Sequence, residues 1–144
     1  MTARTEFEAQ EWDVISEAPP GAALLVITAQ RGGTFRETLA MAKEYAHVRE
    51  QHGGSELLDD LVSSKPHVDH TRYHSQDDLR EAVLGHLREA MTLVRAKAQP
   101  QEVEDYRSFV VTLSQHVAGA HSEHGAEVSE AEKDAIGAIE AALA

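Results

Sequence analysis

Apolar positions along the chain recur at the three- and four-residue spacing of amphipathic helices, and no segment shows the strict alternation of a half-buried strand. Glycines, prolines and Ser/Thr capping signals divide this pattern into segments. The pattern predicts seven helices, at about Thr5–Glu17, Pro20–Gln30, 34–51, Ser55–Val62, 75–97, 100–120 and 129–143. We therefore expect an all-α protein, with residues 1–144 forming a single compact bundle of about seven helices.

The apolar stripes of these segments predict the buried faces. Pro19-Pro20 is expected to end the first helix, and the second is apolar all round, which is typical of a buried helix. The third helix has a predicted stripe of Phe35, Leu39, Ala42, Tyr45 and Val48 or Ala46. The strongest stripe is that of the sixth helix, with Val103, Tyr106, Phe109, Val110, Leu113, Val117 and Ala120.

Composition narrows the classes of partner. The chain has 13 basic and 25 acidic residues, a formal charge of −12, which disfavours nucleic acid. It has no cysteine, so disulfides and thiolate sites are excluded. Its longest apolar run, Gly21–Ala29, is far shorter than the ~20 residues of a membrane span, and Met1–Gln10 lacks the apolar core of a signal peptide. We expect a cytoplasmic protein without membrane insertion, acting with a protein partner or as a homo-oligomer.

Two parts of the chain, Leu24–Tyr45 and Leu113–Leu143, follow one plan: an apolar helix, a glycine-containing turn, a Ser/Thr-x-x-Glu cap and a second helix. This possible helix-turn-helix repeat resembles the TerB-like family of bacterial tellurite-resistance and stress-associated proteins. The resemblance implies divalent metal near the turns, with Glu37 and Glu132 at the positions of the family's glutamates. The family's aspartate before the glycine is replaced here by Arg31 and His124, and a helix cap explains both glutamates without metal.

The polar segment between Ser63 and His74 carries the clearest metal-binding pattern. His67, His70 and His74 lie within eight residues, with Asp69 among them, and imidazoles at short spacing are ligands for zinc, nickel or copper. The alternative is a solvated loop, because the spacing matches no fixed zinc signature.

Other polar groups have structural explanations beside chemical ones. His116, His121 and His124, with Glu123, either form a second cluster or cap the end of the sixth helix. His86 and His116 could meet inside the bundle as an acid-base pair with a tyrosine, Tyr45, Tyr73 or Tyr106, or could simply be hydrogen-bonded at the edge of the core. The acidic groups Asp59 and Asp60, and Glu102, Glu104 and Asp105, are expected on solvated helix faces.

Three functions remain open. The first is a non-enzymatic interaction or sensor module of TerB-like build in a bacterial stress response, with a divalent metal as its possible cofactor. The second is a small metal-dependent hydrolase that uses His67, His70 and His74. The third is a structural oligomer in which Leu24–Ile27 bury against a second copy. No catalytic residue is assigned.

Overall fold

The chain forms helices throughout the part that the structure describes. The computed structural model describes residues 6–29, 34–50, 56–63, 75–122 and 130–144, and these residues contain no strand. The helices are α1 (Ala9–Ala29), α2 (Thr34–Glu50), α3 (Glu56–Val62), α4 (Gln76–Lys97), α5 (Pro100–Ser122) and α6 (Glu130–Leu143). The predicted all-α bundle is confirmed, with six helices in the described ranges in place of about seven.

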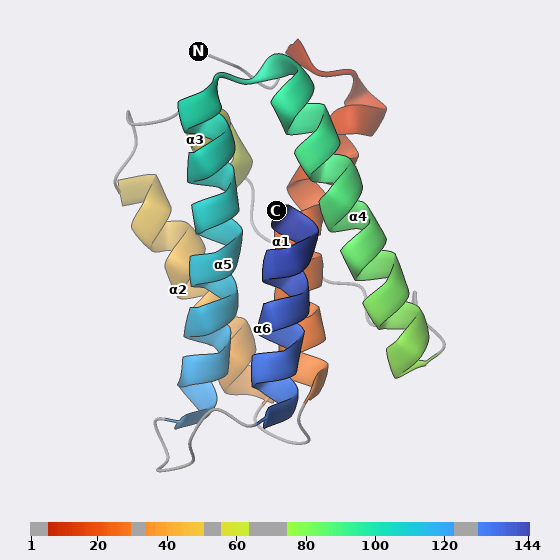
Figure 1. Ribbon diagram of the computed structural model, residues 1–144. Coiled ribbons are helices and arrows are strands. Elements are labelled where there is room, and N and C mark those ends of the chain that lie inside the picture. The colour runs from red at the N-terminus through yellow and green to blue at the C-terminus, as the bar shows by residue number, and fades with distance from the viewer. Residues whose placement is uncertain (1–5, 30–33, 51–55, 64–74, 123–129) are drawn as a thin grey trace.

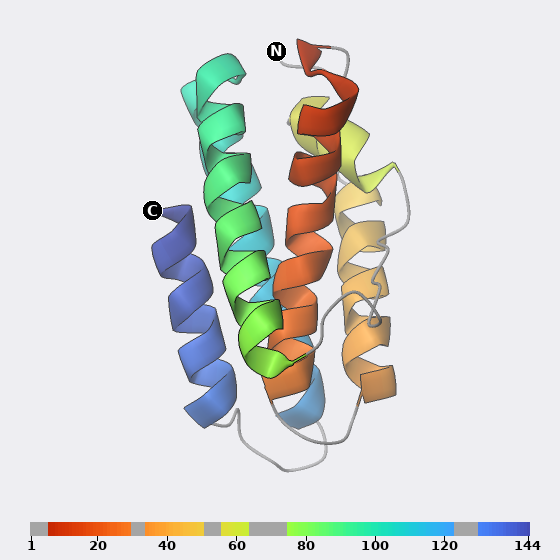
Figure 2. The same cartoon turned by 90° about the vertical axis from the view of Figure 1, so that its right-hand side faces the viewer.

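Helix α1 lies at the centre of the bundle. It contacts α4, α5, α6 and α2, and its apolar second half is buried against them. Figures 1 and 2 show α5 and α6 on one side of α1 and α4 on another. Helices α2 and α3 pack against α5, away from α4. The apolar segment that the sequence marks as buried all round is therefore the helix that the other long helices surround.

The structure has one helix fewer than predicted because Pro19 and Pro20 do not separate two helices. Both prolines lie inside the continuous helix α1 and do not end it. A proline at position 19 has no N–H to donate to the carbonyl of Ile15, four residues earlier. The Tyr106 hydroxyl of α5 donates to that carbonyl instead, at 2.8 Å. A hydrogen bond from another helix thus replaces one of the two that the prolines remove.

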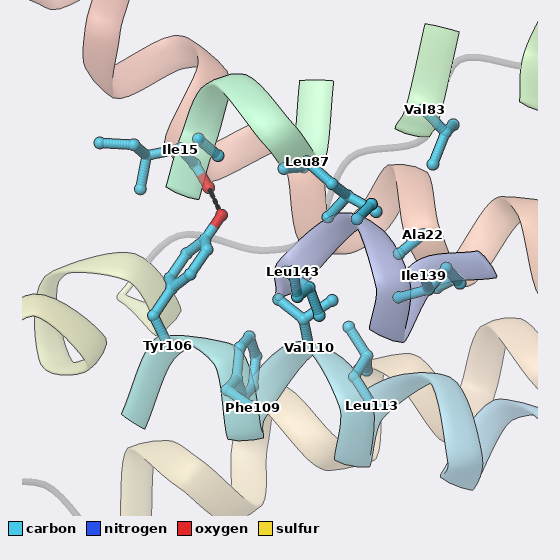
Figure 3. Close-up of a cluster of buried hydrophobic side chains, with 14 of the residues drawn as sticks. Ile15, Ala22, Val83, Leu87, Tyr106, Phe109, Val110, Leu113, Ile139 and Leu143 are labelled. Atoms are coloured by element: carbon cyan, nitrogen blue, oxygen red, sulfur yellow. Dashed lines mark hydrogen bonds between the residues drawn. The ribbon is translucent and has the colours of Figure 1, made fainter. Parts of the chain in front are cut away.

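One contiguous core joins the six described helices, and Figure 3 shows the part of it that lies between α1, α4, α5 and α6. Its fully buried side chains are mainly aliphatic, and the largest include Ile15, Leu87, Leu113, Ile139 and Leu143. The predicted stripe of residues 100–120 is confirmed from Val103 to Val117, whereas Ala120 lies outside the described side chains. The low aromatic content of the sequence is consistent with this aliphatic core, because small and branched side chains allow helices to pack closely.

The predicted buried stripe of α2 is confirmed at Tyr45 and Val48 and wrong at Ala42. Ala42 is exposed, while Met41, Glu44 and Tyr45 are buried and Val48 is half-buried. These four positions have the spacing of one helical face. The sequence does not reveal this face, because Glu44 is part of it and a glutamate is not expected to be buried. The side chains of Phe35 and Leu39 lie outside the described part of the chain.

Helix ends are secured by polar contacts. Ser75 caps α4 by accepting a hydrogen bond from the Asp78 N–H at 3.0 Å, as the sequence predicts. The carbonyl of Leu143, at the end of α6, accepts from Arg95 of α4 and Arg107 of α5, at 3.2 and 3.1 Å. Cationic donors at the negative end of the helix dipole favour the docking of α6.

No helix within the described ranges is both long and apolar enough to cross a membrane.

Glu11 makes the start of α1 sensitive to acid. Its carboxylate accepts from the Glu8 N–H and from Lys97 Nζ, each at 2.9 Å, and these bonds hold the pKa of Glu11 below its usual value. Because the pKa of Glu11 is lower in the folded state than in the unfolded state, its ionised carboxylate stabilises the fold at pH values above the unfolded-state pKa. This stabilisation is lost as the pH falls through the folded-state pKa. We expect Glu11→Gln to lose a modest amount of stability near pH 7 and to show a shallower fall in stability below about pH 4.5. Urea unfolding across pH checks this, and parallel profiles would contradict it.

Candidate functional site: a cleft between α2, α3 and α5

An open cleft of about 510 Å³ lies where α2 and α3 meet α5. Helix α2 contributes Glu44, His47 and Val48, α3 contributes Leu58 and Asp59, and α5 contributes Gln101, Asp105, Ser108, Phe109, Thr112 and His116. The α5 residues recur every three or four positions, so they form one face of that helix. This volume falls within the range of small-ligand sites, about 300–1,000 Å³.

Glu44 and His116 join α2 to α5 at one end of the cleft. His116 Nδ1 lies 2.5 Å from Glu44 Oε2, so the two side chains are hydrogen-bonded. The glutamate side chain is only 7% exposed, whereas the imidazole is 56% exposed. Burying a carboxylate costs free energy unless it is hydrogen-bonded, so His116 makes the inward position of Glu44 tolerable. The pair fixes a buried carboxylate at the wall of an open site.

Glu102 and Arg49 place α3 at the other end. Glu102 is 5% exposed, and its two oxygens accept from the N–H groups of Leu57 and Gln99, at 3.3 and 3.4 Å. These amides lie at the starts of α3 and α5, where free N–H groups need acceptors. Arg49 of α2 donates to the carbonyl of Val62 at the end of α3. The short helix is therefore held at both ends, and its Leu58 and Asp59 line the cleft.

The cleft combines an apolar lining with acidic groups. Val48, Leu58 and Phe109 are the apolar residues of its lining, and the described lining includes no lysine or arginine. Asp105 accepts from Gln101 Nε2 at 3.0 Å, across one turn of α5. A carboxylate offers about four lone-pair positions. Asp105 and Glu44 thus keep acceptor capacity toward the cleft.

The predicted metal ligands are not brought together by the described part of the chain. His67, His70, His74 and Asp69 lie outside the described residues, as does the side chain of Glu37. Glu132 is described: it lies in the first turn of α6 and is 1% exposed. Within the described residues, no group of three or more His, Asp or Glu side chains is placed to hold a metal ion.

The other histidines, acidic residues and tyrosines singled out in the sequence also lie partly inside and partly outside the described residues. His124 and Glu123 lie outside the described residues, and so does the side chain of His121. The predicted acid-base pair was His86 with His116 beside a tyrosine. The structure instead places His116 against Glu44, and the Tyr106 hydroxyl donates to the Ile15 carbonyl. His86 is half-buried on α4. Tyr73 is also outside the described residues.

Sequence reasoning missed the acidic lining of the cleft. Glu102 was expected on a solvated face and is buried, while Asp59 and Asp105 line the cleft. Burial raises the pKa of Tyr45 and Tyr106, so both phenols stay protonated. One signal was present in the sequence: the polar positions of α5 from Gln101 to His116 share a helical face beside its apolar stripe, with Phe109 at the border.

Comparisons with protein-family models, with curated proteins and with solved structures gave no match. The TerB-like resemblance therefore stays a prediction.

Proposed function

We propose that this protein is a non-enzymatic binding module whose recognition site is the cleft between α2, α3 and α5. The observation that carries the proposal is the Glu44–His116 pair, which holds a buried carboxylate at the wall of an open, mainly apolar cleft. Ligand sites have this character, because apolar walls supply affinity and a few fixed polar groups supply orientation.

The Glu44–His116 pair also resembles the arrangement that orients a histidine as a general base. Catalysis on a covalent path would need a nucleophile beside the ring. Ser108 and Thr112 line the same cleft, yet within the described contacts neither hydroxyl is hydrogen-bonded to His116. Binding requires only the shape and charge that the cleft has, so binding is the function we propose.

The other sequence-based expectations stand apart from this site. The hydrolase alternative depends on His67, His70 and His74, and no observation on the described residues favours it. Leu24–Ile27 are buried inside the chain's own core, so they do not form a surface for a second copy. A homo-oligomer through other surfaces, a protein partner, the stress-response role, the cytoplasmic location and the divalent metal stay predictions.

A cleft-filling substitution tests the proposal. We expect amide resonances of α2, α3 and α5 to shift when the protein is titrated with a panel of small amines, carboxylates and neutral alcohols. Thr112→Trp places an indole in the cleft and should weaken the binding of any panel member at least about tenfold, or about 1.4 kcal/mol.

Thr92→Trp is the matched control, because Thr92 is exposed on α4 and does not line the cleft. It should leave binding unchanged. No amide shifts in the cleft with any panel member, or equal binding by both tryptophan variants, would contradict the proposal.

A further inference from the structure

We infer that the ligand of this cleft is a linear aliphatic diamine or polyamine, held by its two ends. This inference rests on the proposed function and names the chemical class of the ligand. It is carried by the arrangement of charge along the cleft, where carboxylates stand at both ends and apolar side chains lie between them.

The two ends of the cleft are fixed by contacts. Glu44 is at the His116 end, because those two side chains are hydrogen-bonded. Asp59 belongs to the opposite end, because the bond from the Leu57 N–H to Glu102 places the first turn of α3 beside the first turn of α5. Asp105 lies on that same end of α5.

The cleft is elongated. The α-carbons of Asp105 and His116 are separated by about 16 Å along the axis of α5, at about 1.5 Å per residue. Phe109 lies between them on the same face, and Val48 is one turn beyond Glu44 toward α3. An occupant that reaches both ends must therefore be a chain rather than a compact molecule.

The charge of the cleft selects a cation. Its described lining has three carboxylates, Glu44, Asp59 and Asp105, and no basic side chain other than two histidines. An ammonium group forms short, charge-assisted hydrogen bonds with carboxylates. The net charge of −12 also attracts cations over longer distances.

The middle of the cleft accepts methylene groups. Burial of apolar surface there contributes about 25 cal/mol per Å². Phe109 also lines this part of the cleft, although it is only 4% exposed. A chain with an ammonium group at each end and methylenes between them matches all three zones of the cleft, whereas a fatty acid would place its carboxylate beside a like charge.

Diamines of equal charge and different length test this inference. Calorimetric titration with putrescine, 1,8-diaminooctane and 1,12-diaminododecane should show affinity rising at least about tenfold from putrescine to the longer chains. Octylamine, which has a single ammonium group, should bind at least about tenfold more weakly than 1,8-diaminooctane, a difference of about 1.4 kcal/mol. Equal affinity for these two would overturn the inference, because the second end would then contribute nothing.

Charge-removing variants locate the two ends. Glu44→Gln and Asp105→Asn should each weaken the longest diamine about tenfold, and Glu89→Gln on the exposed face of α4 should not, although it removes the same charge. Asp105 is only half-buried, so Asp105→Asn is expected to fold even if Glu44→Gln does not. If Asp105→Asn and Glu89→Gln lowered the affinity for the longest diamine equally, net charge alone would attract the ligand, and the inference would be overturned.

The pattern of binding across these compounds distinguishes failure of the polyamine inference from failure of the proposed function. If carboxylates or neutral alcohols shift the cleft amides and the diamines do not, the cleft is a ligand site and the polyamine inference is overturned. If no compound of any charge shifts them, both are overturned.

Discussion

Ile139→Ala should lower the free energy of unfolding by about 2–5 kcal/mol, the usual cost of truncating a fully buried branched side chain. Ile139 is 0% exposed, and α6 contacts α1, α4 and α5 (Figure 3). The cavity would therefore open at the junction of four helices. Urea unfolding should show a lower midpoint with an unchanged slope, and thermal unfolding should show a Tm lower by roughly 10 °C.

Ile136→Ala is the matched control on the same helix. Ile136 is only partly buried, so its truncation removes less contact and leaves no closed cavity. Both changes replace isoleucine by alanine in a helix, so the gain in helix propensity is the same and cancels in the comparison. We expect Ile136→Ala to cost about 1 kcal/mol or less. Equal costs at the two positions would mean that α6 is not docked as described.

The helices themselves could be predicted because their signals are local. The stripe of α5 and the Ser75 cap of α4 depend on residues within a few turns of one another, and both are confirmed. The continuity of α1 could not be predicted in the same way. The donor that satisfies Ile15 comes from Tyr106, 91 residues away in sequence, and no local pattern contains it.

The candidate site was harder to predict for a similar reason. Glu44 is buried only because His116, 72 residues further on, pairs with it. Without that partner, a glutamate on an amphipathic helix is expected to face solvent. Asp105 and Asp59 were likewise assigned to solvated faces, since only the approach of α3 to α5 makes one cleft from them.

The second large expected effect on the free energy of unfolding concerns the hydrogen bond from the Tyr106 hydroxyl to the Ile15 carbonyl. Tyr106→Phe leaves the Ile15 carbonyl without its donor in a buried position, which should cost about 1–3 kcal/mol. Tyr45→Phe is the control with the same chemical change. The Tyr45 hydroxyl is buried and has no hydrogen-bond partner within the described structure, so its removal should be neutral or slightly stabilising.

A double-mutant cycle with Pro19→Ala tests the cause directly. Alanine at position 19 supplies the N–H that proline lacks, so the helix itself can satisfy the carbonyl of Ile15. Tyr106→Phe should then cost at least about 1 kcal/mol less in the Pro19→Ala background than in the natural one. Packing losses from either substitution appear in both backgrounds and cancel. Four urea unfolding curves measure this coupling energy, and an equal cost in the two backgrounds would show that Tyr106 contributes packing alone and does not replace the bond that Pro19 removes.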